Sequence, residues 1–123
     1  MATIKRFEEI ISWQEARELN KMLGALIDTG RFKNNFRLIN QIEGSAGSIM
    51  DNIAEGFESG SDAAFVRYLQ IAKGSCAEVK SMLFLCEDFH ICTSEERIKL
   101  HAHLYEISSG IYKLIQFLIK NKG

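Results

Sequence analysis

Three side chains that can bind a metal ion lie close together in the sequence: Cys86, His90 and Cys92. A helix would place Cys86 and His90, at positions i and i+4, on one face. A tetrahedral zinc site needs a fourth ligand, however, and this spacing matches no standard zinc motif. Cys86 also continues an apolar repeat, where a thiol packs as a small hydrophobic group. We therefore expect no metal site here. His101 and His103 would point to different faces of a later helix, and we expect them at the surface or at an interface.

Two carboxylates, Glu55 and Glu78, are candidates for an acid–base pair or a metal site. Helical bundles that hold two metal ions use a Glu-x-x-His motif on each of two helices. This motif occurs once here, from Glu87 to His90, so the pattern predicts no dimetal centre. Asn52 borders an apolar repeat near Glu55, and buried polar groups need hydrogen-bond partners. We expect Asn52 and Glu55 to form hydrogen bonds to neighbouring helices.

Nucleophilic catalysis and phosphate binding find little support in the sequence. Ser48 and Ser75 fall in helical segments, and no Gly-x-Ser-x-Gly turn surrounds either of them. Gly44 and Gly47 do not form a phosphate-binding loop, because no strand precedes them and no Lys-Ser/Thr pair follows. We predict a protein that is not an enzyme and uses no cofactor.

Basic side chains that could contact nucleic-acid phosphates gather around the start of the second helix and on one face of the third. They are Arg31, Lys33, Arg37, Lys73 and Lys80. The net charge of the chain is −1, whereas proteins that bind nucleic acid strongly are usually basic. These residues are therefore either a weak RNA contact, multiplied in an oligomer, or ordinary solvated charges.

Length and composition indicate one domain, residues 1–123. The absence of proline favours long uninterrupted helices. No apolar run approaches the ~20 residues of a membrane span, and the first residues do not resemble a signal peptide. The odd number of cysteines, without a framework spacing, suits a reducing compartment. We expect a cytoplasmic protein that does not bind membranes.

Apolar residues recur every three or four positions in four segments, which is typical of helices that bury one face. The expected helices cover about 13–28, 35–58, 62–89 and 94–120. Helices of this length with short connections favour antiparallel neighbours. The sequence thus predicts an all-α fold, a four-helix up-and-down antiparallel bundle with left-handed packing.

Capping signals mark three of the helix starts. Ser12 with Glu15, and Thr93 with Glu96, have the spacing of a capping box. Ser61, or Asp62 beside it, is a candidate N-cap for the third helix.

The segment 41–56 is rich in small residues yet keeps its apolar repeat. A glycine inside a helix lowers stability by about 1 kcal/mol relative to alanine. We expect close approach of a neighbouring helix at Gly44 and Gly47 to offset this loss.

The third and fourth helices carry more apolar surface than one core-facing stripe needs. On the fourth helix the main stripe includes Leu114, and a second stripe repeats every seven residues. Either the core-facing stripe is wide or the second stripe joins identical subunits, since large exposed apolar patches are rare on monomers. The residues predicted for such an interface are Tyr68, Ile98, Tyr105, Tyr112 and Ile119.

The strings SIMDNIAEG (48–56) and IAKGSCAEV (71–79), with Trp13, Gln14 and Ala16 upstream, resemble the four-helix bundle proteins of the 23S rRNA intervening-sequence family. The resemblance covers nearly the whole chain. The signature positions that it marks as structural are Asn52, Glu55, Gly56, Gly74, Ser75 and Glu78. Relatives form rings, typically of five subunits, so the resemblance implies a homo-oligomeric ring, a pentamer.

The resemblance also implies a non-enzymatic accessory or scaffold protein associated with RNA or a ribonucleoprotein. Relatives commonly carry a basic pair after the match to Gln41 and Ile42, where this chain has Glu43 and Gly44. That change removes positive charge from a position suited to nucleic-acid contact. The alternative is a protein-interaction module that does not bind nucleic acid and presents its surface to an unknown protein partner.

Overall fold

The computed structural model describes residues 4–120, and all regular secondary structure in this part of the chain is helical, without a strand. A short 3₁₀ helix, η1 (Phe7–Glu9), precedes α1 (Ile11–Asp28), α2 (Phe36–Glu58), α3 (Asp62–Asp88) and α4 (Ser94–Lys120). The all-α class and the four long helices are confirmed, with bounds within two residues of those expected. The ends of the expected domain, residues 1–3 and 121–123, lie outside the described residues.

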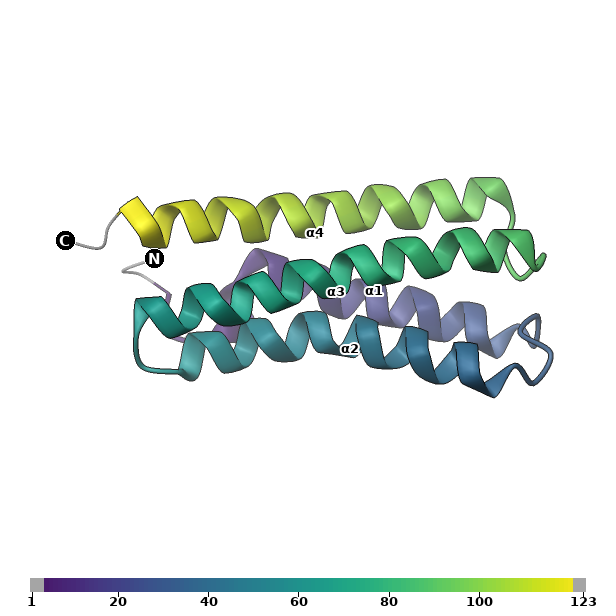
Figure 1. Ribbon diagram of the computed structural model, residues 1–123, viewed down its shortest axis with the longest axis horizontal. Helices are drawn as coiled ribbons and strands as arrows, with labels where there is room; N and C mark the ends of the chain where they lie inside the picture. Colours follow the sequence, from purple (N-terminus) through teal and green to yellow (C-terminus); the bar gives the residue numbers. More distant parts are fainter. Residues whose placement is uncertain (1–3, 121–123) are drawn as a thin grey trace.

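The four long helices lie side by side, with their connections at alternate ends of the molecule (Figure 1). Each helix packs against two others: α1 against α2 and α4, and α3 against α2 and α4. Within residues 4–120, no Cα atoms of α1 and α3, or of α2 and α4, lie within 8 Å of each other. The helices therefore occupy the corners of a square, and the bundle has four outer faces, each formed by two neighbouring helices.

The core is made of the apolar stripes expected from the sequence. The apolar repeats of α1, α2 and α3 are buried: Ala16, Leu19, Leu23 and Leu26 of α1, Ile42, Ala46, Ile49 and Ile53 of α2, and Phe65, Leu69, Ala72, Cys76, Val79, Leu83 and Cys86 of α3. Ile39 of α2 is only partly buried. One expected core residue of α4 is wrong: Leu114 is only partly buried, and Ile115 takes the core position instead. The apolar repeat can be continued through either neighbour, and the packing of α4 against its neighbours selects Ile115.

The helix starts confirm two of the three predicted caps. The Thr93 hydroxyl accepts a hydrogen bond from the Glu96 N–H, and Glu96 Oε1 accepts one from the Thr93 N–H, which is a complete capping box. The Ser61 hydroxyl accepts from the Ala64 N–H. The cap predicted at Ser12 is wrong, because α1 begins earlier, at Ile11, and Ser12 lies buried inside the helix.

The expected reason for the glycines of α2 is also wrong. A Cβ atom added at Gly44 or Gly47 would meet no atom within 4 Å. The close approach occurs instead at Gly56, where a Cβ would lie 2.8 Å from both Cδ1 of Phe65 and Cβ of Tyr68. A glycine is required at the end of α2 because α3 begins its first turns directly against the α2 backbone.

Candidate functional site

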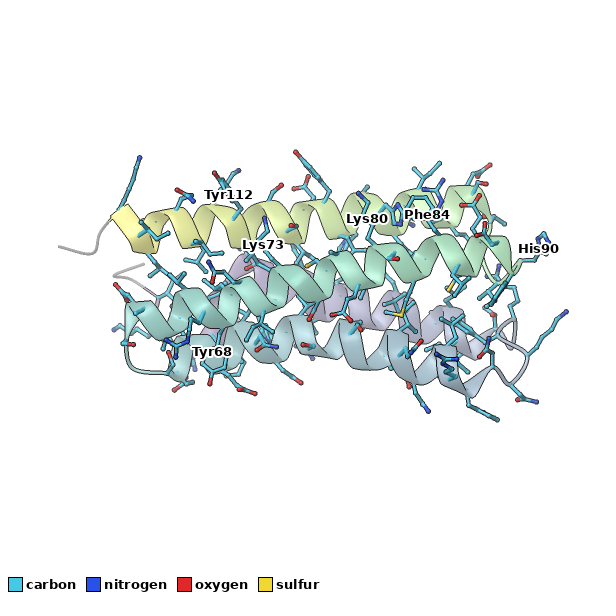
Figure 2. The ribbon with its side chains drawn as sticks, viewed as in Figure 1. Tyr68, Lys73, Lys80, Phe84, His90 and Tyr112 are labelled. Carbon is cyan, nitrogen blue, oxygen red and sulfur yellow. The ribbon has the colours of Figure 1, made fainter. Side chains whose placement is uncertain are left out.

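The outer face between α3 and α4 brings together residues that the sequence suggested for two different purposes. Lys73 and Lys80, candidate phosphate contacts, lie seven residues apart on α3. Tyr105 and Tyr112, candidate interface residues, lie seven apart on α4. All four side chains line one groove between the helices: Lys73, Lys80 and Tyr105 line one cavity of it, and Lys73, Tyr105 and Tyr112 line the next. We call this surface the α3/α4 face; Figure 2 shows Lys73, Lys80 and Tyr112 along it.

Lys73 crosses the groove and contacts the aromatic ring on the opposite helix. Its Nζ atom lies 5.2 Å from the centroid of the Tyr112 ring, within the range of a cation–π interaction. Neither Lys73 nor Lys80 belongs to an ion pair within residues 4–120. The α3/α4 face thus carries two positive charges that no carboxylate of the described chain neutralises.

Phe84 and His101 close the groove nearer the connection between α3 and α4. Their ring centroids are 4.7 Å apart at an interplanar angle of 70°, and the Arg97 guanidinium lies 4.7 Å from the Phe84 centroid. His101 Nε2 lies 3.0 Å from the backbone carbonyl oxygen of Lys80. Burial is the main cause that lowers the pKa of His101, and the hydrogen bond to the Lys80 carbonyl acts in the opposite direction. Neutral imidazole can donate one hydrogen bond to this carbonyl, so His101 fastens α4 to α3.

Phe84 and Arg97 belong to the α3/α4 face but were not predicted from the sequence. Phe84 is four residues after Lys80, so it shares a helix face with that lysine. Arg97 is four residues before His101 and pairs with Glu87 across the connection. Helical spacing was therefore the available signal for Phe84, whereas the Glu87–Arg97 pair depends on how the connection folds.

The α3/α4 face is hollowed. Lys73, Ala77, Lys80, His101 and Tyr105 line one open cavity of about 270 Å³. A second cavity of about 260 Å³ continues it between Lys73 and Tyr112. Tyr105 lines both cavities and is 71% exposed. Such a surface is suited to contact with another macromolecule rather than to enclosing a small molecule.

Four of the five predicted interface residues form a single exposed row on α4, which we call the α4 ridge. They are Ile98, Tyr105, Tyr112 and Ile119, exposed by 57%, 71%, 53% and 53%. The fifth, Tyr68, does not join them. It is partly buried on the side of α3 that packs against α2, over Gly56. The structure therefore separates Tyr68 from the α4 ridge.

The remaining basic candidates lie at the end of the bundle where α1 connects to α2. Arg31 forms two hydrogen bonds to the Glu96 carboxylate, at 2.9 and 3.0 Å. This Arg31 contact and the capping box lower the pKa of Glu96 to about 2. Arg31 is thus engaged in joining the α1–α2 connection to α4. Lys33 and Arg37 are exposed and belong to no ion pair within residues 4–120.

The signature residues fall into a group that is buried or half-buried and a group that is exposed. The buried group is a chain of hydrogen bonds: Asn52 Nδ2 donates to the Ser48 carbonyl at 2.8 Å, and the Ser48 and Ser75 hydroxyls lie 3.0 Å apart. Asn52 therefore bonds within its own helix, and the prediction of a direct bond to a neighbour is wrong. Ser48 provides the link between helices instead.

The exposed group contains Glu55, Gly74 and Glu78. Within residues 4–120 neither carboxylate has a hydrogen bond or an ion pair, so the expected bond from Glu55 to a neighbouring helix is also wrong. A Cβ atom at Gly74 would meet nothing within 4 Å. Packing inside one chain gives no reason for these residues.

The cysteine cluster near the end of α3 is part of the core. Cys86 and Cys92 are buried, whereas His90 is exposed and has a left-handed backbone with φ of 62°. His90 points away from the bundle end (Figure 2). Burial raises the pKa of Cys86 to about 11 and also raises that of Cys92. No group of three or more His, Cys, Asp or Glu side chains within residues 4–120 is arranged to hold a metal ion. In the same range, no helix has the length and apolarity to span a bilayer.

Comparison with known proteins identifies the family of the chain and a solved structure of similar fold. The family model described as 23S rRNA-intervening sequence protein matches residues 8–113. A crystal structure of a protein of unknown function from Bacteroides thetaiotaomicron, assigned to the S23 ribosomal protein family, is similar in fold with a TM-score of 0.77. The two chains are 23% identical, and the match covers 85% of this chain and 98% of the other. No curated protein matches the chain.

Proposed function

Because the chain belongs to the 23S rRNA-intervening sequence protein family, we propose that it is a non-enzymatic scaffold assembled from identical copies. Each copy is an up-and-down four-helix bundle with left-handed packing, and the copies form a closed ring. Five copies is the ring size that the resemblance of the signature segments implies.

The observation that carries this proposal is the α4 ridge. Its four side chains are all more than half exposed, and they follow one line over three heptads of α4. Covering a side chain of this kind gains about 1 kcal/mol when half of it is already buried. Four such residues in one row favour association by several kcal/mol in aggregate, before the entropy of association opposes it.

Substitution of Tyr112 tests the assembly. Tyr112→Glu places a charge on the α4 ridge at a position outside the core, so we expect a lower oligomer mass by light scattering at an unchanged helical circular dichroism signal. Lys99→Gln is the matched control. It changes the net charge by the same amount, and Lys99 lies on the side of α4 that faces α1. An unchanged mass for Tyr112→Glu would exclude Tyr112 from the interface.

A second part of the proposal is that the assembly associates with RNA through Lys33 and Arg37. These cations are exposed, belong to no described ion pair and lie at one end of each bundle, so a ring would repeat them. We expect a mobility shift of a labelled oligoribonucleotide that weakens steeply with salt, and weaker binding by the Lys33→Glu, Arg37→Glu double variant. Absence of a shift at low salt would leave the alternative, a protein-interaction module that does not bind nucleic acid.

We further propose that this scaffold works in the cytoplasm. Its three cysteines are unpaired and buried, which is the form that a reducing compartment maintains.

A further inference from the structure

A second groove lies on the other side of α3, between α2 and α3. It is an open cavity of about 440 Å³, and its lining includes Gln41, Gly44 and Ser45 of α2 with Glu78 and Met82 of α3. We call this the α2/α3 groove. Gly44 deepens it, since a Cβ at this position would meet nothing within 4 Å. The groove thus has small residues along one wall and an acidic and an apolar side chain along the other.

The α2/α3 groove lies at the same height along the bundle as Tyr105, the most exposed residue of the α4 ridge. Tyr112 is level with Lys73, and His101 is level with Phe84, so Tyr105 lies level with Lys80. On the other side, Ser48 is level with Ser75. Because α2 and α3 are antiparallel, four residues back along α2 from Ser48 correspond to four residues forward along α3 from Ser75. Gly44 is therefore level with Val79. Tyr105 and Gly44 therefore differ in height by about one residue, or about 1.5 Å.

We propose that the α4 ridge of one copy docks into the α2/α3 groove of the next copy, with Tyr105 seated beside Gly44. This inference rests on the self-association proposed above and specifies its two surfaces. Copies related by rotation about an axis parallel to their helices keep equal heights, so the ridge and the groove meet without a shift. The contact is heterologous: each copy uses a different surface toward each of its two neighbours.

Charge and apolar character match along this contact. Lys80 beside the ridge and Glu78 in the groove are two residues apart on α3, on opposite sides of it, and neither has an ion-pair partner within residues 4–120. Docking brings Lys80 of one copy near Glu78 of the next. Ile71 lies seven residues before Glu78, is 52% exposed, and stands near the height of Tyr112. An exposed apolar residue is thus available opposite the next tyrosine of the ridge.

The positions of the two surfaces around the bundle fit a small closed ring. They are adjacent faces that share α3, and adjacent faces of a square bundle differ in direction by about 90°. The two contact faces of one subunit differ in direction by about 90° in a ring of four and by about 108° in a ring of five. The shared helix then points toward the ring axis. The exposed side of α3 carries Gly74, Ala77 and Ser81, small residues that allow α3 helices of several copies to converge. This arrangement gives Gly74 the role that packing within one chain does not explain.

Disulfide trapping tests the proposed contact. We would make the full chain with Gly44→Cys and Tyr105→Cys together, oxidise it, and separate the products on a non-reducing gel. The native cysteines are buried and do not interfere. The expected result is a ladder of dimers and larger species, because each copy can bond to two neighbours. The matched control pairs Gly44→Cys with Glu106→Cys, since Glu106 is exposed next to Tyr105 but turned toward the α1 side of α4. This pair should give no ladder.

The outcomes separate this inference from the proposed function. A parent chain with the mass of several subunits, but no ladder from the double variant, overturns the ridge-in-groove contact and leaves self-association intact. Dimers from Tyr105→Cys alone, with no larger species, also overturn it, because they indicate a contact of the ridge with itself. A parent chain with the mass of one subunit overturns both proposals. A Lys80→Glu, Glu78→Lys double variant that regains the oligomer mass lost by either single variant supports the pairing independently.

Discussion

Gly56→Ala is expected to destabilise the protein, although alanine is the better helix former. An added Cβ would lie 2.8 Å from Cδ1 of Phe65 and 2.8 Å from Cβ of Tyr68, far inside the ~3.5–4.0 Å of a normal carbon contact. The Phe65 ring can turn, but the Tyr68 Cβ is fixed to the α3 backbone, so the helices themselves must separate. Overpacking of this kind costs about 1–3 kcal/mol, against a gain of about 1 kcal/mol from replacing glycine in a helix. We expect a net loss of up to about 2 kcal/mol of unfolding free energy.

Gly47→Ala provides the matched control on the same helix. A Cβ at Gly47 would meet nothing within 4 Å, so only the gain of up to about 1 kcal/mol remains. The two variants should differ by the overpacking cost, about 1–3 kcal/mol, in urea denaturation followed by circular dichroism. All samples must have the same protein concentration, because assembly makes apparent stability depend on concentration. A Gly56→Ala protein as stable as Gly47→Ala would refute the claim that the α2–α3 backbone approach requires glycine.

Three further predictions concern the core and the charged cluster near the α3–α4 connection. Glu96→Gln keeps the cap but removes the charge that pairs with Arg31. Because the folded pKa of Glu96 is about 2, below its ordinary 4.5, the wild-type advantage should be full above pH 4.5 and disappear as pH falls to about 2, measured by thermal denaturation. Ile53→Asp should abolish cooperative folding, since Ile53 is fully buried and a buried unpaired charge costs several kcal/mol; a soluble, fully helical variant would contradict this. Burial raises the pKa of Cys76 to about 12 and that of Cys86 to about 11, so both thiols should react with iodoacetamide slowly in the native protein and rapidly in denaturant, by mass spectrometry.

The fold was largely predictable because helical periodicity identifies which residues share a face. Periodicity does not fix the edge of the buried face or the residue at which a helix begins, and the errors at Leu114 and Ser12 have these two causes. Leu114 and Ile115 both continue the α4 repeat, and only the neighbouring helices distinguish them. Ser12 has the residue type of an N-cap, but α1 begins before it and buries it. Local signals were sufficient at Thr93, where both partners of the capping box lie within one turn.

The candidate site was less predictable because it is formed by two helices. Spacing grouped Lys73 with Lys80, and Tyr105 with Tyr112, but it could not show that the two pairs share one groove. Likewise, a sequence cannot show that Gly44 is open to solvent while Gly56 meets α3, since both are helical glycines. Arg31 and Glu96 are 65 residues apart in the sequence, so no local sequence pattern predicts their contact.

The α3/α4 face cannot serve RNA and a second copy at the same time. Lys80 and Tyr105 line the same cavity, so a partner that covers the tyrosine also restricts access to the lysine. Salt distinguishes the two uses. Contacts of Lys73 and Lys80 with phosphates would weaken steeply as salt rises, because counterions replace them. Burial of the α4 ridge depends on apolar surface, and excluded salts such as sulfate strengthen it. Assembly that persists or grows in sulfate would assign this face to self-association. Weaker RNA binding by the Lys33→Glu, Arg37→Glu double variant, at an unchanged oligomer mass, would then assign the RNA contact to Lys33 and Arg37.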